Sequence, residues 1–268
     1  MSLDPWMLLV FLALGAVAGV LAGLLGVGGG LVLVAALAWL LPAQGVVPPE
    51  AAMHAALATS LASIVFTAMS SARAHAKRGS VLWPTVAWMV PGILVGGWLG
   101  SRVAVGLDGV WLRWGVAIYC LIAAAQMILS RPRDAGDASI VPRGPWLTAA
   151  GGGIGAVSSL VGIGGGSMTV PLLTWRGVVP VRAVGTSSAC GVFIGLASAL
   201  GYAFNAPAGA LPSHAIGYVY LPAAICVAMA SVLAAPLGTR IAHAISGPML
   251  KRVFALFLLV VGASFLLP

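Results

Sequence analysis

The sequence predicts an all-α polytopic membrane protein of two homologous halves, each with a glycine-broken helical hairpin followed by three transmembrane helices. Three observations lead to this fold class. Of the 268 residues, 61% are hydrophobic and only 7% are charged, whereas a soluble domain carries about 25% charged residues. The apolar residues gather in long stretches, and one glycine-rich phrase occurs in each half.

The duplication is clearest in the glycine-rich phrase. Residues 19–30 read GVLAGLLGVGGG and residues 155–166 read GAVSSLVGIGGG, with six of twelve positions identical. The match continues later in each half: ATS at 58–60 aligns with GTS at 185–187, and GSR at 100–102 with GTR at 238–240. The offsets between matched positions are 136, 127 and 138 residues, and they change in connectors. This pattern is typical of duplication followed by drift in loops.

The elements follow in the same order in both halves. The first half, residues 1–130, has a broken apolar segment at 6–41 and plain spans near 51–72, 81–103 and 111–129. A polar linker, residues 131–145, is expected in the cytoplasm. The second half, residues 146–268, has a broken segment at 146–175 and spans near 183–204, 217–241 and 250–267. The plain spans have about the 17–25 residues that a helix needs to cross a bilayer.

The distribution of basic residues favours a hairpin for each broken segment. With single crossings, six Lys and Arg fall on one side and seven on the other. With hairpins, eleven fall on one side and only Arg102 and Arg113 on the other, as the positive-inside rule requires. Each half then has an odd number of helical segments, because the hairpin contributes two and the plain spans contribute three. The halves are therefore predicted to be inverted repeats with both termini outside.

The glycine runs predict helix breaks at membrane depth, because each glycine costs about 1 kcal/mol relative to alanine inside a helix. A helix that restarts after a break offers unpaired N–H groups and a positive dipole end, which together bind an anion. Two such ends meeting near the midplane predict one shared substrate pocket. Close packing of helices through small residues is the alternative. The substrate-binding candidates in the breaks are Gly28, Gly29, Gly30, Gly164, Gly165 and Gly166.

Hydroxyl side chains near the breaks are the second group of substrate-binding candidates. They can donate to the oxygens of an anion, or they can bond back to the preceding turn of their own helix. These candidates are Thr59, Ser60, Ser167, Thr186, Ser187 and Ser188.

Basic side chains and histidines suggest weaker roles. Arg102 and Arg240 match across the repeat at the ends of spans, where they either gate anions electrostatically or snorkel to the interface. His54 precedes Thr59 by about one and a half turns and is either a proton carrier or an interface histidine. Val181 replaces it in the second half, so the repeat gives it no symmetric role. His75 is expected in a basic loop, facing solvent.

Several other function classes lack their signatures in this chain. Neither glycine run is followed by a Walker A lysine, and there is no HExxH motif or mid-membrane aspartate pair, so the protein is not expected to be an enzyme. The three cysteines lie in apolar segments and form no CxxC pair, so no metal or other cofactor is expected. The net charge of +8 comes from connectors, so nucleic acid is not expected as a partner.

At the glycine turns the chain resembles the sulfite exporter TauE/SafE family of membrane permeases. The resemblance is carried by residues 23–34, 159–173, 58–61 and 185–188, which read GLLGVGGGLVLV, SLVGIGGGSMTVPLL, ATSL and GTSS. It covers essentially the whole chain and implies about eight spans and transport of small, often sulfur-containing anions such as sulfite or sulfoacetate. The second copy has the family's proline at Pro171, whereas the first has Ala35 at that position.

The predicted function is therefore a secondary transporter for a small anion, moved by alternating access in the inner (plasma) membrane. An anion channel and a non-transporting assembly or sensor subunit are the alternatives. The expected partners are the small anionic substrate and the lipid bilayer. Proton coupling and assembly into a homo-oligomer are left open by the sequence.

Overall fold

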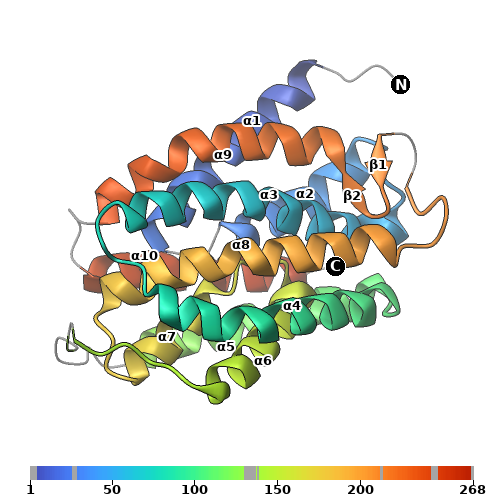
Figure 1. Cartoon of the computed structure of the whole chain (residues 1–268). Helices are drawn as coiled ribbons and strands as arrows, with labels where there is room; N and C mark the ends of the chain where they lie inside the picture. Colours follow the sequence, from blue (N-terminus) through green and yellow to red (C-terminus); the bar gives the residue numbers. More distant parts are fainter. Residues whose placement is uncertain are drawn as a thin grey trace.

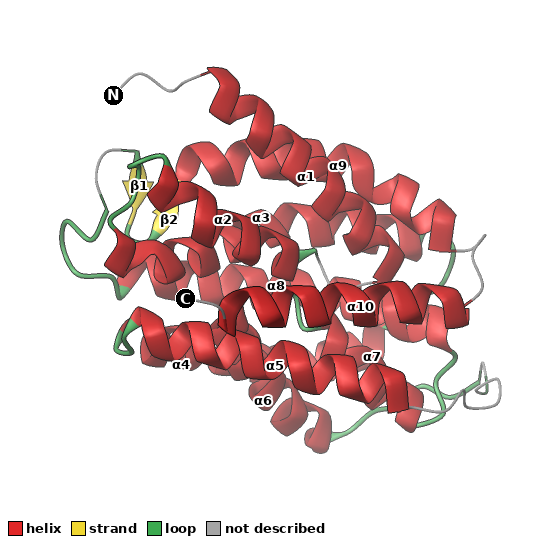
Figure 2. Ribbon diagram, turned by 180° about the vertical axis from the view of Figure 1, so that it is seen from behind, coloured by secondary structure: helices red, strands yellow, loops and turns green. Residues whose placement is uncertain are grey.

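The computed structural model describes residues 5–25, 29–129, 137, 139–211, 214–242 and 247–266, and within them the fold is almost entirely helical (Figures 1 and 2). The first half contains α1 (Pro5–Leu25), α2 (Gly30–Ala43), the short 3-10 helix η1 (Pro49–Ala51), α3 (Ala52–Ala76), α4 (Trp83–Val105) and α5 (Gly109–Leu129). The second half contains α6 (Pro145–Val161), α7 (Gly166–Trp175), α8 (Pro180–Phe204), the strands β1 (Ala215–Ile216) and β2 (Val219–Tyr220), α9 (Leu221–Ala242) and α10 (Gly247–Leu266).

Six of the described helices are long and apolar enough to cross a membrane, which confirms an all-α polytopic membrane fold. Among these six, α3 and α8 form the centre: 78% and 72% of their most apolar windows are buried, against at most 44% in the other four. Figure 1 shows α1 and α9 along one side of the bundle and α4, α5 and α6 along the opposite side, with α3 and α8 between them.

Local sequence explains where several helices begin. Proline stands in the first turn of α4, α6 and α8, where its missing N–H removes no helical hydrogen bond and its fixed φ suits the helix. Glycine in the left-handed region starts α2 and α7. The broken segments at 6–41 and 146–175 thus become the helix pairs α1–α2 and α6–α7.

The second broken segment folds back on itself. The guanidinium carbon of Arg176, just after α7, lies 3.9 Å from the ring centroid of Trp146 in the first turn of α6. The chain therefore leaves this hairpin at the end where it entered. In the first half, Gly29 lies against the backbone of Ala18 in the middle of α1, so α2 likewise begins beside α1.

The first helix of each half packs mainly on a helix of the other half. Helix α1 packs mainly on α9 and its counterpart α6 mainly on α4. Both pairs run parallel: Gly15 and Val20 contact Val227 and Gly238, respectively, and Gly92 and Gly100 contact Thr148 and Ala156. The equivalent central helices α3 and α8 run antiparallel, since Gly195 lies against Leu61 and Gly185 against His75. If both cross the bilayer, antiparallel equivalents are what an inverted repeat requires.

Two sequence-based expectations were wrong in detail. The span expected from residue 217 begins at Leu221, because residues 215–220 form a short antiparallel hairpin in which Ala215 pairs with Tyr220. His75 lies in the last turn of α3 rather than in a loop, and only 1% of it is exposed. Packing of α8 against this turn covers the imidazole, which the loop-like local sequence does not reveal.

The described basic residues separate between the two ends of the bundle. Gly185 packs beside Ser80, and Thr85 donates a hydrogen bond to the carbonyl of Pro142, so the connectors after α3, before α6 and before α8 share one end. Arg102 ends α4, and Arg113 lies one turn into α5 at the opposite end. Which end faces the cytoplasm stays a prediction, as does the cytoplasmic linker, of which residues 131–136 and 138 lie outside the described range.

Candidate functional site

The two helix breaks have nearly the same backbone geometry. Gly29 starts α2 with φ 66° and ψ 4°, and Gly165 starts α7 with φ 73° and ψ 0°. A side chain in this left-handed region costs roughly 1–2 kcal/mol, which explains glycine at both positions. Both residues are buried. Gly28 lies outside the described residues.

The breaks meet at the centre of the protein, joined by the hydroxyl of Ser60. Its Oγ lies 3.2 Å from the carbonyl oxygen of Gly30 and 3.0 Å from that of Gly162. A Cβ on Gly30 would meet this same Gly162 carbonyl and lie 3.1 Å from the Cα of Ile163. Ser60, predicted as a substrate ligand, therefore also ties the start of α2 to the end of α6.

The matched threonines Thr59 and Thr186 occupy equivalent structural positions. The Oγ1 of Thr59 accepts the N–H of Tyr220, and the Oγ1 of Thr186 accepts the N–H of Leu82, each at 3.0 Å. Tyr220 and Leu82 immediately precede α9 and α4, respectively. Each threonine therefore accepts a hydrogen bond from the residue just before a helix and fixes the start of that helix. A role of these hydroxyls in binding substrate stays a prediction.

The remaining predicted hydroxyl side chains lie on α7 and α8. Ser167, in the first turn of α7, shares a hydrogen bond with the hydroxyl of Tyr119 on α5. Ser188 donates to the carbonyl of Val184 at 3.0 Å, and its Oγ lies 3.1 Å from that of Ser71. Ser187 is fully buried in α8. Tyr119 was not predicted from the sequence, because nothing in its helix marks it as facing the break.

Two further hydroxyls at the second break were also missed. Ser158 on α6 and Thr169 on α7 are both 0% exposed, and neither hydroxyl oxygen has a hydrogen-bond partner among the described residues. The Oγ of Ser158 lies 3.3 Å from where a Cβ on Gly165 would be, and the N–H of Thr169 donates to the carbonyl of Gly165 at 2.8 Å. A buried hydroxyl without a partner is costly, so these two groups indicate a ligand site.

The backbone adds donors at this point. Met168 and Thr169 begin the helical hydrogen bonding of α7 by donating to Gly165. Within the described chain, the N–H groups of residues 164–167 have no hydrogen-bond acceptor. Gly164 and Gly166, two of the predicted residues, thus contribute backbone donors at the positive end of the helix dipole. These N–H groups lie at the same buried break as the Ser158 hydroxyl.

The predicted gating and proton-coupling residues lie away from the breaks. Arg102 and Arg240 are exposed near the ends of α4 and α9. The Nε2 of His54 lies 3.0 Å from the carbonyl oxygen of Leu107 and 3.2 Å from that of Ala104, and its ring stacks on Tyr218. These contacts join α3 to the α4–α5 connector. Proton transfer by His54 stays a prediction.

Comparison with known proteins assigns the family. The family model described as "Sulfite exporter TauE/SafE" matches residues 11–265. The chain belongs to the sulfite exporter TauE/SafE family. A protein from Haemophilus influenzae is 36% identical over 97% of this chain and 98% of its own length, and one from Xylella fastidiosa (strain Temecula1) is 30% identical over 95% and 93%, respectively. Both carry the name "Probable membrane transporter protein". No solved structure matches the chain significantly.

The family and these names identify the protein as a multi-pass membrane transporter. The resemblance noted at residues 23–34 and 159–173 is confirmed by the family match, which includes both glycine breaks.

Proposed function

We propose that this TauE/SafE protein is a secondary transporter that carries a small oxyanion by alternating access, with the second glycine break as its main binding site. The substrate class we favour is a sulfur oxyanion or organosulfonate, such as sulfite or sulfoacetate. The family description supports the sulfur chemistry. The observation that carries the proposal is the pair of buried, unpartnered hydroxyls of Ser158 and Thr169 beside the start of α7.

Neutral donors suit a transported anion. Several N–H groups and hydroxyls at a helix N-terminus stabilise negative charge without a cation, and a hydrogen bond to a charged group contributes about 1.5–3 kcal/mol. A full countercharge in a buried site would hold an anion more strongly and slow its release. The donors at the second break are backbone amides with Ser158, Ser167 and Thr169.

The packing supports a carrier rather than an open channel. Gly29, Gly30 and residues 164–166 are all buried, so an anion reaches them only if the surrounding helices rearrange. The antiparallel relation of α3 and α8 supports inverted repeats whose exchange would open the site to each side in turn. We place both termini outside the inner membrane, following the basic residues.

Solid-supported-membrane currents from purified protein in liposomes test this proposal. Sulfite, sulfoacetate, thiosulfate, sulfate, chloride and lactate are applied in turn to the wild type, to Thr169→Val and to Thr148→Val. Thr148 provides a matched control on α6, since it is partly exposed and its hydroxyl bonds to the carbonyl of Trp88. We expect saturating currents for a sulfur oxyanion, an at least tenfold lower kcat/KM in Thr169→Val, and little change in Thr148→Val.

Other outcomes identify the alternatives. Equal transport by the two threonine variants would move the site away from the second break. A current that does not saturate with anion concentration would favour an anion channel. The absence of flux for every anion, in a pH-dye assay as well as in currents, would favour an assembly or sensor subunit.

A further inference from the structure

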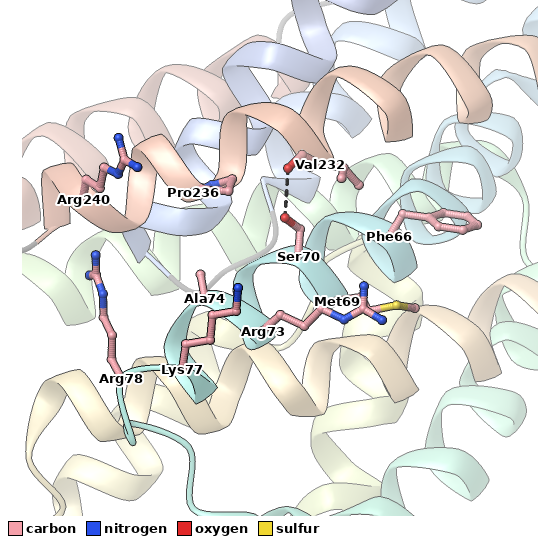
Figure 3. Close-up of a pocket in the computed structure, with 10 residues that line it drawn as sticks. All are labelled: Phe66, Met69, Ser70, Arg73, Ala74, Lys77, Arg78, Val232, Pro236 and Arg240. Atoms are coloured by element: carbon pink, nitrogen blue, oxygen red, sulfur yellow. Dashed lines mark hydrogen bonds between the residues drawn. The ribbon is translucent and has the colours of Figure 1, made fainter.

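A basic pocket lies between α3 and α9, at the end of the bundle where both helices finish (Figure 3). Its volume is about 560 Å³, well within the range of ligand pockets. Ser70 forms part of its wall and donates a hydrogen bond of 2.9 Å to the carbonyl of Val232, which joins the two helices. The lining residues from α3 and the turn after it are Phe66, Met69, Ser70, Arg73, Ala74, Lys77 and Arg78, and those from α9 are Val232, Pro236 and Arg240.

Four of the ten lining residues are cations, Arg73, Lys77, Arg78 and Arg240, and none is acidic. All four are exposed. In the view of Figure 3, Lys77 and Arg78 point from the end of α3 in the direction of α9, which carries Arg240. Like charges around one pocket repel one another, and an anionic ligand removes that repulsion.

The other part of the pocket is apolar. Phe66 and Met69 lie deeper along α3, and Val232 and Pro236 line the pocket from α9. From Phe66 to Lys77 the helix advances about 16 Å, so apolar wall and cations follow one another along the membrane normal. The ring of Phe66 is 53% exposed within a membrane-spanning helix, which opens this wall towards lipid.

The equivalent groove of the other half lacks the cations. By the repeat offsets, α8 carries Leu200, Phe204 and Asn205 where α3 carries Arg73, Lys77 and Arg78. Only Arg102 on α4 retains its match with Arg240. The basic cluster is therefore not a consequence of the duplicated fold, and it marks one membrane face.

We propose that this pocket binds an anionic phospholipid, with the phosphate held by Lys77, Arg78 and Arg240 and an acyl chain against Phe66 and Met69. A small hydrophilic anion would use the cations but gain nothing from the apolar wall, whereas a phospholipid matches both. The basic end is also the one predicted to face the cytoplasm, the leaflet side on which basic pockets between helices bind anionic headgroups. The proposal is independent of the transported substrate.

Native mass spectrometry of the full-length protein in detergent tests the proposal. Phosphatidylglycerol and phosphatidylcholine with identical acyl chains are titrated, each with and without inorganic phosphate or sulfate as competitor. The variants are Lys77→Gln/Arg78→Gln, the charge-conserving Lys77→Arg/Arg78→Lys, and a control with the same charge loss elsewhere, Arg102→Gln/Arg143→Gln. Lys77 and Arg78 are exposed in the turn that follows α3, so their substitution leaves the core intact.

We expect phosphatidylglycerol to bind more tightly than phosphatidylcholine. Its apparent Kd should rise roughly tenfold or more in Lys77→Gln/Arg78→Gln, since each basic residue near the headgroup contributes about fivefold. The charge-conserving variant and the Arg102/Arg143 control should bind like the wild type. Equal binding of the two lipids, or equal loss in the control, would overturn the proposal. Displacement of the lipid by phosphate or sulfate at matching concentration would reassign the pocket to small free anions.

Discussion

Gly29 and Gly165 start their helices with the same left-handed backbone, yet the side chains around the two breaks differ in kind. The second break has the hydroxyls of Tyr119, Ser158, Ser167 and Thr169, and their matches across the repeat are Phe257, Ala22, Leu31 and Leu33. Ala22, Leu31 and Leu33 are buried, with at most 2% exposed. Duplication thus supplied two helix ends, and at these four pairs of matched positions side-chain divergence left the hydroxyls on the second-break member only.

We propose that this difference gives the two breaks separate tasks. An apolar break packs without buried polar groups that need partners, so it suits a structural hinge. A polar break with unpartnered hydroxyls stays unsatisfied until a ligand arrives.

Leucine at Gly165 should abolish transport. Its Cβ would meet the Cδ1 of Ile194 and lie 3.3 Å from the Oγ of Ser158, in a backbone region unfavourable to side chains. Gly153→Leu is the matched control, because this exposed glycine on α6 has nothing within 4 Å of its Cβ position. Proteoliposome currents and thermal unfolding would be measured for both. Normal transport by Gly165→Leu would remove the second break from the mechanism.

Removal of the Ser60 hydroxyl should destabilise the protein by about 1–3 kcal/mol, since the buried carbonyls of Gly30 and Gly162 then lose a donor. The control is Ser264→Ala, whose hydroxyl bonds only to Val261 in its own helix and should cost less than about 0.5 kcal/mol. Unfolding in detergent, followed by intrinsic tryptophan fluorescence, compares the two. Equal stability of both variants would show that the bridge between the breaks contributes little.

Single substitutions at the two matched aromatic residues, Tyr119 and Phe257, should affect transport unequally. Tyr119→Phe removes the hydroxyl bonded to Ser167 and should change the KM for the anion several-fold, as expected for about 1 kcal/mol. Phe257→Tyr adds a hydroxyl at the matching position of α10 and should leave KM unchanged. A larger effect of Phe257→Tyr would contradict the polar asymmetry.

The smallest effect is expected for Arg102→Gln. An exposed arginine at a helix end steers anions only through a screened field, so transport at low salt should fall by less than about threefold. The loss should vanish near 1 M of an untransported salt. A loss that persists in high salt would indicate direct contact between Arg102 and the substrate.

The sequence predicted much of the fold because membrane helices depend on local properties. Long apolar segments need helices to satisfy their backbone in lipid. Gly29 and Gly165, in the left-handed region, break two of these segments, whereas the glycine run at residues 151–153 stays helical within α6. The broken segments and plain spans therefore agree with the observed helices to within a few residues at most ends. The start of α9 at Leu221 was missed because the hairpin before it depends on pairing between Ala215 and Tyr220.

The tertiary structure decided which hydroxyls have partners and which do not. Thr59 and Thr186 were predicted from their match across the repeat to bind substrate, and only packing showed that they accept the N–H groups of Tyr220 and Leu82. Ser158 and Thr169 carry no distinctive local pattern, since their importance lies in burial beside Gly165 from two different helices. Composition and periodicity determine that a segment crosses the membrane, whereas a polar site depends on contacts between distant segments that no local pattern encodes.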